Sequence, residues 1–193
     1  YLFLGGFALA AALHRQQLDS YLALRMIHLA GGRLSRAVWL LFLASGLLSM
    51  WISNTATVVI MLPLALGLLN DIDREQQLNT HTFVLLGVAY SASLGGMGAL
   101  VGSPPNAIAA AYAHLGFFDW MRFGVPVMLI LWPLALGILY LLLRPNLQHR
   151  LSVAVDADQS QWLWTRTRRL TLLIFGVTVL AWIFSQPLSR LLG

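Results

Sequence analysis

The chain has 193 residues, of which 59% are hydrophobic and 10% charged, a balance outside the range of soluble globular proteins. It contains no cysteine, which excludes a disulfide framework and a thiolate metal site. All twelve basic residues are arginine, without the interleaved aromatics of single-strand nucleic-acid binders, so we expect them to mark cytoplasmic loops and not to bind nucleic acid.

Apolar stretches longer than about 18 residues recur along the chain and predict an all-α, polytopic membrane protein. Because the sequence opens with Tyr1 inside an apolar run, we expect it to be an internal piece of a larger protein. Residues 1–13 are expected to be the end of a membrane span. Residues 18–33 mix apolar and charged side chains, which predicts a helix lying in the membrane interface.

The stretch 37–69 is uncharged but has a polar centre. No residue between Arg36 and Asp71 carries a charge. The polar side chains in its middle are Ser45, Ser49, Ser53, Asn54, Thr55 and Thr57. The stretch is long for one span, and two full spans would have only about 15 residues each, fewer than membrane helices need. A re-entrant helical hairpin is the third possibility.

The distribution of arginines distinguishes between a single span and a hairpin for residues 37–69. Arginines cluster at 15–36 and again at 144–169, and both clusters should face the cytoplasm. If 37–69 crossed once, the following spans at 82–113 and 123–143 would leave the second cluster outside. If 37–69 enters and returns, both clusters lie inside, so we predict a re-entrant hairpin.

A second interruption lies in the segment 82–113, where glycines and prolines replace the apolar pattern. Ser103 is suited to a helix N-cap and Pro104 to the first helical position, which predicts a broken membrane helix. Two interrupted hydrophobic segments are typical of a transporter's binding site. Residues 123–143 are expected to form a plain span. Residues 144–169 are expected to be a cytoplasmic linker, and a final span is expected in 170–193.

Both interruptions are electrically neutral. No Arg, Lys, Asp or Glu lies in 37–70 or 76–118, whereas a proton-coupled pump normally needs a titratable group at membrane depth. Helix termini offer an anion only about half a unit charge each. A cation held by oxygen atoms would supply the remaining charge and couple the uptake of the anion to that of the cation.

Two other interpretations remain open for these polar residues. Small and hydroxyl-bearing residues in membrane helices often serve only helix packing. An intramembrane hydrolase using Ser53 or Ser103 is a third possibility, although neither serine lies in a G-x-S-x-G turn or near a His or Asp in sequence.

The motifs M-W-I-S-N-T-A-T with the following Met61-Leu62-Pro63, and G-G-M-G-A-L-V-G-S-P-P-N, resemble the divalent anion:sodium symporter family. The opening F-L-G-G-F-A-L-A-A-A-L-H-R is similar to that family as well. The resemblance covers nearly the whole chain and corresponds to the N-terminal half of a dicarboxylate transporter. One departure is Ala99, where many relatives carry threonine.

The resemblance implies one inverted repeat of an elevator-type transporter, located in the bacterial inner membrane as a multi-pass protein. In such a transporter residues 37–143 would belong to the moving transport domain, and residues 1–36 and 170–193 to the scaffold. By similarity, the first sodium site would be formed by Ser49, Ser53, Asn54 and Gly102. The anion's carboxylate would meet Asn54, Thr55 and Ser103. A second repeat with its own hairpin would complete the protein, which would work as a homodimer.

The function expected from this resemblance is sodium-coupled transport of a divalent anion such as the C4-dicarboxylate succinate, and not catalysis. Citrate and sulfate remain open as substrates. A sodium-independent anion exchanger of the same fold is the alternative within transport.

Overall fold

The computed structural model describes residues 2–18, 21, 29–70, 72–149 and 165–183. Within these ranges the chain is built from helices, as the sequence predicts. They are α1 (Leu2–Arg15), α3 (Leu34–Ser49), α4 (Asn54–Leu69), α5 (Leu78–Gly95), the 3-10 helix η1 (Leu100–Gly102), α6 (Pro104–Tyr112), α7 (Phe117–Leu143) and α8 (Arg166–Ile183).

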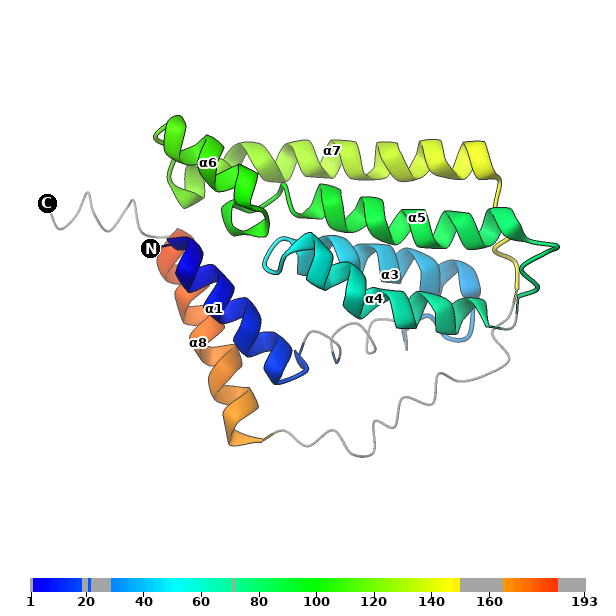
Figure 1. Cartoon of the computed structure of the whole chain (residues 1–193), viewed down its shortest axis with the longest axis horizontal. Helices are drawn as coiled ribbons and strands as arrows, with labels where there is room; N and C mark the ends of the chain where they lie inside the picture. The colour runs from blue at the N-terminus through cyan, green and yellow to red at the C-terminus, as the bar shows by residue number, and fades with distance from the viewer. Residues whose placement is uncertain (1, 19–20, 22–28, 71, 150–164, 184–193) are drawn as a thin grey trace, which may run out of the picture.

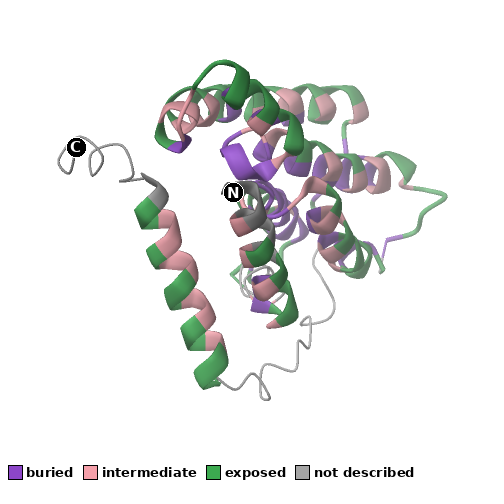
Figure 2. Cartoon of the chain, turned by 60° about the vertical axis from the view of Figure 1, so that its left-hand side comes forward, coloured by how far each residue is buried: buried purple, intermediate pink, exposed green. Residues whose placement is uncertain are grey.

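The helices α3, α4, α5 and α7 lie alongside one another as a bundle, and α1 and α8 lie across one of its ends (Figure 1). The core of the bundle contains Phe42 and Leu41 of α3, Met61 of α4 and Phe83 of α5, all fully buried. The described residues of α8 are exposed or half-buried (Figure 2). The bundle thus carries the hydrophobic core, and α8 borders it.

The closest helix contact joins α3 to α5 and depends on glycine. A Cβ atom added at Gly87 would overlap the ring of Phe42, and one added at Gly95 would overlap the backbone of Gly46. Small residues at such crossings let two helix backbones approach closely, as is common between membrane helices. Because the contacts run from Phe42–Gly87 to Gly46–Gly95, the two helices are parallel.

The predicted hairpin is present as two antiparallel helices, α3 and α4, joined by the four residues 50–53. It begins at Leu34, three residues earlier than predicted. Each limb has 16 residues, which at 1.5 Å per residue gives about 24 Å, less than the roughly 30 Å of a hydrocarbon core. That the hairpin re-enters a membrane stays a prediction.

The predicted break in the second segment is also present. Helix α5 ends at Gly95, η1 follows after four residues, and α6 starts at Pro104 with Ser103 as its N-cap residue. The two helical pieces extend from Leu78 to Tyr112, whereas the sequence placed them at 82–113.

Helix α7 begins at Phe117, six residues before the predicted start of its span at 123. The carboxylate of Asp119 accepts a hydrogen bond of 3.1 Å from the Gly116 N–H, which closes the first turn. With 27 residues, α7 is the one helix among the described residues that is long and apolar enough to cross a membrane.

Two further predictions concern the ends of the chain. Helix α8 begins at Arg166, so the last four residues of the predicted linker 144–169 belong to this helix. The rest of the linker from 150 onward, and most of the predicted interfacial helix at 18–33, lie outside the described residues. Gly31 and Gly32 have positive φ angles of 59° and 73° and form a turn before α3.

Candidate functional site

The turn between α3 and α4 is stabilised by the side chain of Ser53. This residue is the N-cap of α4, and its hydroxyl oxygen accepts a hydrogen bond of 3.3 Å from the Ala56 N–H. Serine is favoured at this position because its oxygen satisfies one of the free N–H groups of the first helical turn. The local sequence therefore determines where the second limb of the hairpin starts.

A hydrogen bond crosses the turn between the last residue of α3 and the first residue of α4. The hydroxyl of Ser49 donates to Oδ1 of Asn54 over 2.7 Å. Ser49 is fully buried, Asn54 is half-buried, and the neighbouring Thr55 is exposed. Ser45, one turn before Ser49, donates instead to the carbonyl of Leu41 within its own helix and does not join the turn.

The tip of the hairpin lies against the second break. Gly96 leaves so little space that a Cβ atom there would overlap Oδ1 of Asn54. A Cβ atom at Gly102 would lie 2.9 Å from the carbonyl oxygen of Ser49. The structure thus brings Ser49, Asn54 and Gly102, which the sequence resemblance groups together, to one junction of two non-helical segments.

The start of α6 lies at the same junction. Ser103 follows Gly102 directly, is half-buried, and makes no capping hydrogen bond with its side chain. Helices α4 and α6 both start at this junction. The first turn of α4 presents free N–H groups, whereas α6 starts with Pro104 and Pro105, which have no N–H, so α6 contributes only the partial positive charge of its helix dipole. Together with the neutral oxygen atoms of Ser49 and Asn54, this arrangement is suited to a small hard cation and an anion side by side.

Asn106 is the residue at this site that the sequence reading missed. Its Nδ2 donates to the carbonyls of Gly96 and Ala99, both over 2.8 Å, and its side chain is 7% exposed. Asn106 is the third residue of α6, the position from which a side chain reaches back over the helix start. Its place three residues after the N-cap residue Ser103 was the sequence signal from which this role could have been predicted. The buried Ala99 contributes its carbonyl to this network.

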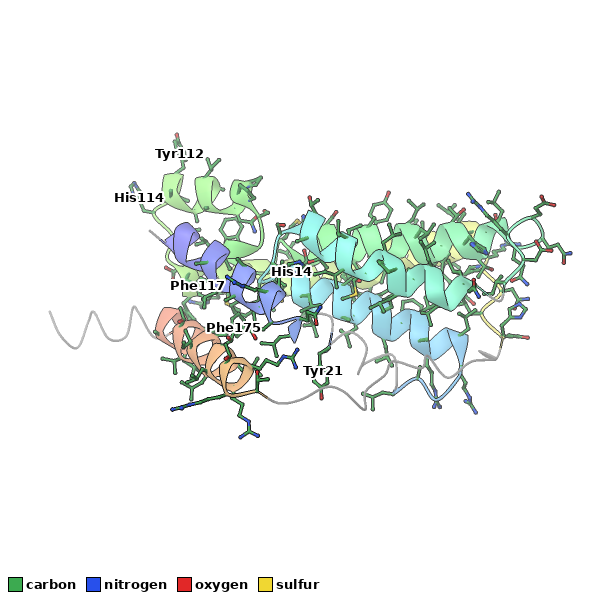
Figure 3. The ribbon with its side chains drawn as sticks, turned by 60° about the horizontal axis from the view of Figure 1, so that its bottom comes forward. His14, Tyr21, Tyr112, His114, Phe117 and Phe175 are labelled. Atoms are coloured by element: carbon green, nitrogen blue, oxygen red, sulfur yellow. The ribbon has the colours of Figure 1, made fainter. Side chains whose placement is uncertain are left out.

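An aromatic residue of the hairpin tip, Trp51, packs against aromatic rings of two other helices. The ring of Trp51 packs edge-on against Phe175 of α8 at 5.4 Å between centroids, and lies 6.3 Å from Phe117 of α7. Figure 3 shows Phe117 and Phe175 at this end of the bundle, while Tyr112 and His114 point away from it at the end of α6. Helix α8 therefore contacts the tip of the hairpin directly.

The family model for citrate transporters (CitMHS) matches residues 1–193, the whole chain. The chain belongs to the citrate transporter family. This confirms the predicted family resemblance and places the chain in a family of membrane transport proteins.

Three relatives within this family illustrate the similarity. An uncharacterized transporter of Haemophilus influenzae is 52% identical over 98% of the chain, and one of Methanocaldococcus jannaschii is 39% identical over 93%. The sodium-dependent dicarboxylate transporter SdcS of Staphylococcus aureus is 36% identical over 75% of the chain. The chain spans 40% of the length of the first two relatives and 30% of the third, because all three are much longer proteins.

We expect the change Asn106→Asp to destabilise the second break. Aspartate has nearly the same shape, but its carboxylate donates no hydrogen bond and would face the carbonyls of Gly96 and Ala99. Each buried acceptor left unpaired costs about 1–3 kcal/mol. Thermal unfolding of the purified full-length protein should therefore begin several degrees lower than in the wild type. The exposed Asn79→Asp is the matched control, and equal melting of the two variants would contradict the role of Asn106.

Proposed function

We propose that this chain supplies a sodium site and half of an anion site of a sodium-coupled symporter for C4-dicarboxylates such as succinate. The sodium ion is a co-substrate in this proposal, held by oxygen atoms of Ser49, Ser53, Asn54 and Gly102. One carboxylate of the anion meets Asn54, Thr55 and Ser103 at the N-termini of α4 and α6.

One observation carries the proposal: the hairpin tip and the second break meet, with Gly96 against Asn54 and Gly102 against the Ser49 carbonyl. Neither segment contains an Arg, Lys, Asp or Glu. An anion at this junction therefore meets no basic side chain from either segment, and an oxygen-bound cation offsets its charge. Binding of the anion then depends on the cation, which is the basis of symport.

The relatives support the same substrate class. A relative that is 36% identical over 158 residues carries the name of a sodium-dependent dicarboxylate transporter. The family as a whole is described as citrate transporters, so a tricarboxylate is the nearest competing substrate. In an elevator-type mechanism the α3–α7 bundle would move relative to a scaffold containing α1 and α8, in a homodimer of full-length subunits.

The test separates the symporter from a sodium-independent exchanger of the same fold. Full-length protein is reconstituted in proteoliposomes, and uptake of labelled succinate is measured with external sodium or with choline in its place. We expect choline to reduce uptake to the background of empty liposomes, and unlabelled fumarate to compete better than citrate or sulfate. Equal uptake in choline would contradict sodium coupling and favour the exchanger.

A further inference from the structure

A cavity lies at the end of the bundle opposite the hairpin tip. It has a volume of about 580 Å³ and lies between the start of α3, the last turns of α7 and the segment 145–148. Ser35 and Trp39 line it from α3, and Gly137 and Tyr140 from α7. No residue of the transport site described above lines it, so it needs a separate explanation.

The walls of this cavity are held in place by buried contacts. The rings of Trp39 and Tyr140 both pack edge-on against the fully buried Phe83, at 6.2 and 5.8 Å between centroids. The segment after α7 is fixed by a hydrogen bond of 3.0 Å from the Asn146 N–H to Oγ1 of Thr80. The two aromatic rings and the segment 145–148 are therefore already in position to line the cavity.

Two exposed arginines lie next to the residues that line the cavity. Arg36 and Arg144 are exposed, and each is the direct neighbour in sequence of a lining residue. Arg36 also lies one helical turn before Trp39, on an adjoining part of α3. The lining itself contains no acidic residue. Arg144 and Glu75 both line an adjoining cavity of about 290 Å³, and Asn146 borders the two cavities, so two arginines and one glutamate lie near the site. The electrostatic environment favours an anionic ligand.

The cavity also borders an exposed apolar surface. Leu141, which lines it, is 71% exposed, and Leu142 is 75% exposed on the same helix. Helix α7 is the long apolar helix of the described structure. A small inorganic anion would leave these leucines uncovered, whereas a molecule with an anionic head and hydrocarbon chains satisfies both surfaces. Tryptophan and tyrosine are typical of the depth where lipid headgroups lie.

We propose that this cavity binds the headgroup of an anionic phospholipid, with the acyl chains lying along α7. Arg36 and Arg144 attract the phosphate, the polar atoms of Ser35 and Tyr140 face the headgroup, and Leu141 contacts the start of a chain. Basic pockets between membrane helices recognise anionic headgroups in this way. The lipid would add to the hydrogen bond that already holds the segment 145–148 against the bundle where the chain leaves α7.

Two independent variants test the site in the full-length protein. Gly137→Leu fills the cavity, and because a Cβ atom at Gly137 has no neighbour within 4 Å, the change should not disturb the helix. Gly67→Leu is its control, since Gly67 of α4 is equally free of neighbours and does not line the cavity. The pair Arg36→Gln with Arg144→Gln removes the charge. The exposed pair Arg74→Gln with Arg122→Gln removes the same charge elsewhere.

The measurement is a titration of each purified protein with short-chain phosphatidylglycerol, phosphatidylcholine or inorganic phosphate. Lipid adducts are followed by native mass spectrometry, and thermal midpoints are recorded in parallel. We expect saturable binding of phosphatidylglycerol to the wild type and both controls. Removing two guanidinium groups should weaken it about 25-fold, at about fivefold per charge. Gly137→Leu should abolish the saturable adduct.

Three results would overturn the proposal. Phosphatidylcholine could bind as tightly as phosphatidylglycerol, inorganic phosphate could stabilise the protein as well as the lipid does, or both test variants could bind like their controls. If Gly137→Leu fails to fold, the charge pair decides alone. None of these readouts depends on sodium or on transport.

Discussion

Replacing Asn54 with alanine is expected to lower sodium-driven uptake of succinate by about 100-fold in the full-length protein. The change removes the amide oxygen that lies against Gly96 and accepts the Ser49 hydroxyl. An interaction between a polar group and a charged one contributes about 1.5–3 kcal/mol, which corresponds to a factor of about 10 to 150. Uptake by proteoliposomes, corrected for the amount of protein inserted, measures the effect.

The control for this variant is Asn70→Ala. Asn70 is exposed at the opposite end of the same helix, α4, so its replacement changes the same residue type far from the junction. We expect this control to transport at the wild-type rate. An Asn54→Ala protein that retained most of its sodium-driven uptake would show that the hairpin tip does not bind the co-substrate.

The second large effect is expected from adding a single methyl group at Gly102. The new Cβ atom of Gly102→Ala would meet three backbone atoms, the carbonyl oxygen and carbon of Gly96 and the carbonyl oxygen of Ser49. Backbone atoms cannot rotate away as a side chain can, so the tip and the break must separate. Overpacking of this kind costs about 1–3 kcal/mol, which predicts about 5- to 150-fold weaker apparent affinity for sodium.

A sodium titration of uptake, combined with sodium-dependent thermal stabilisation of the purified protein, measures this shift. Gly137→Ala serves as the matched control because a Cβ atom there meets nothing within 4 Å. The two variants complement each other, since Asn54→Ala removes a ligand and Gly102→Ala displaces the ligands that remain. If the sodium affinity of Gly102→Ala were unchanged, the second break would not be part of the cation site.

The two interruptions were predictable because their signals are local. Ser53 caps α4 through its own hydroxyl, and Ser103 with Pro104 starts α6, so a few neighbouring residues determine each helix start. Helix α7 starts at Phe117, six residues before the predicted span at 123, because the hydrogen bond between the Gly116 N–H and Asp119 closes its first turn.

The contacts between distant segments were not predictable from residue types. The sequence shows that Asn106 belongs to a motif, but only the folded chain shows its amide bound to two carbonyls of the preceding loop. The cavity between α3 and α7 is a similar case, because Ser35 and Gln148 are more than a hundred residues apart in the chain and line the same space. Such pairings depend on how the helices pack against one another, and residue types along a single sequence do not predict that packing.

The sequence alone determined that the chain is helical and apolar, that two neutral polar segments interrupt it, and to which family it belongs. These properties follow from composition, from the charge pattern and from residues that act on their own backbone. Only the tertiary structure decided that Gly46 and Gly95 place α3 against α5, and that Gly102 then faces the Ser49 carbonyl. The reason is steric: without a Cβ atom at these positions the backbones approach each other, and that approach sets which oxygen atoms share one site.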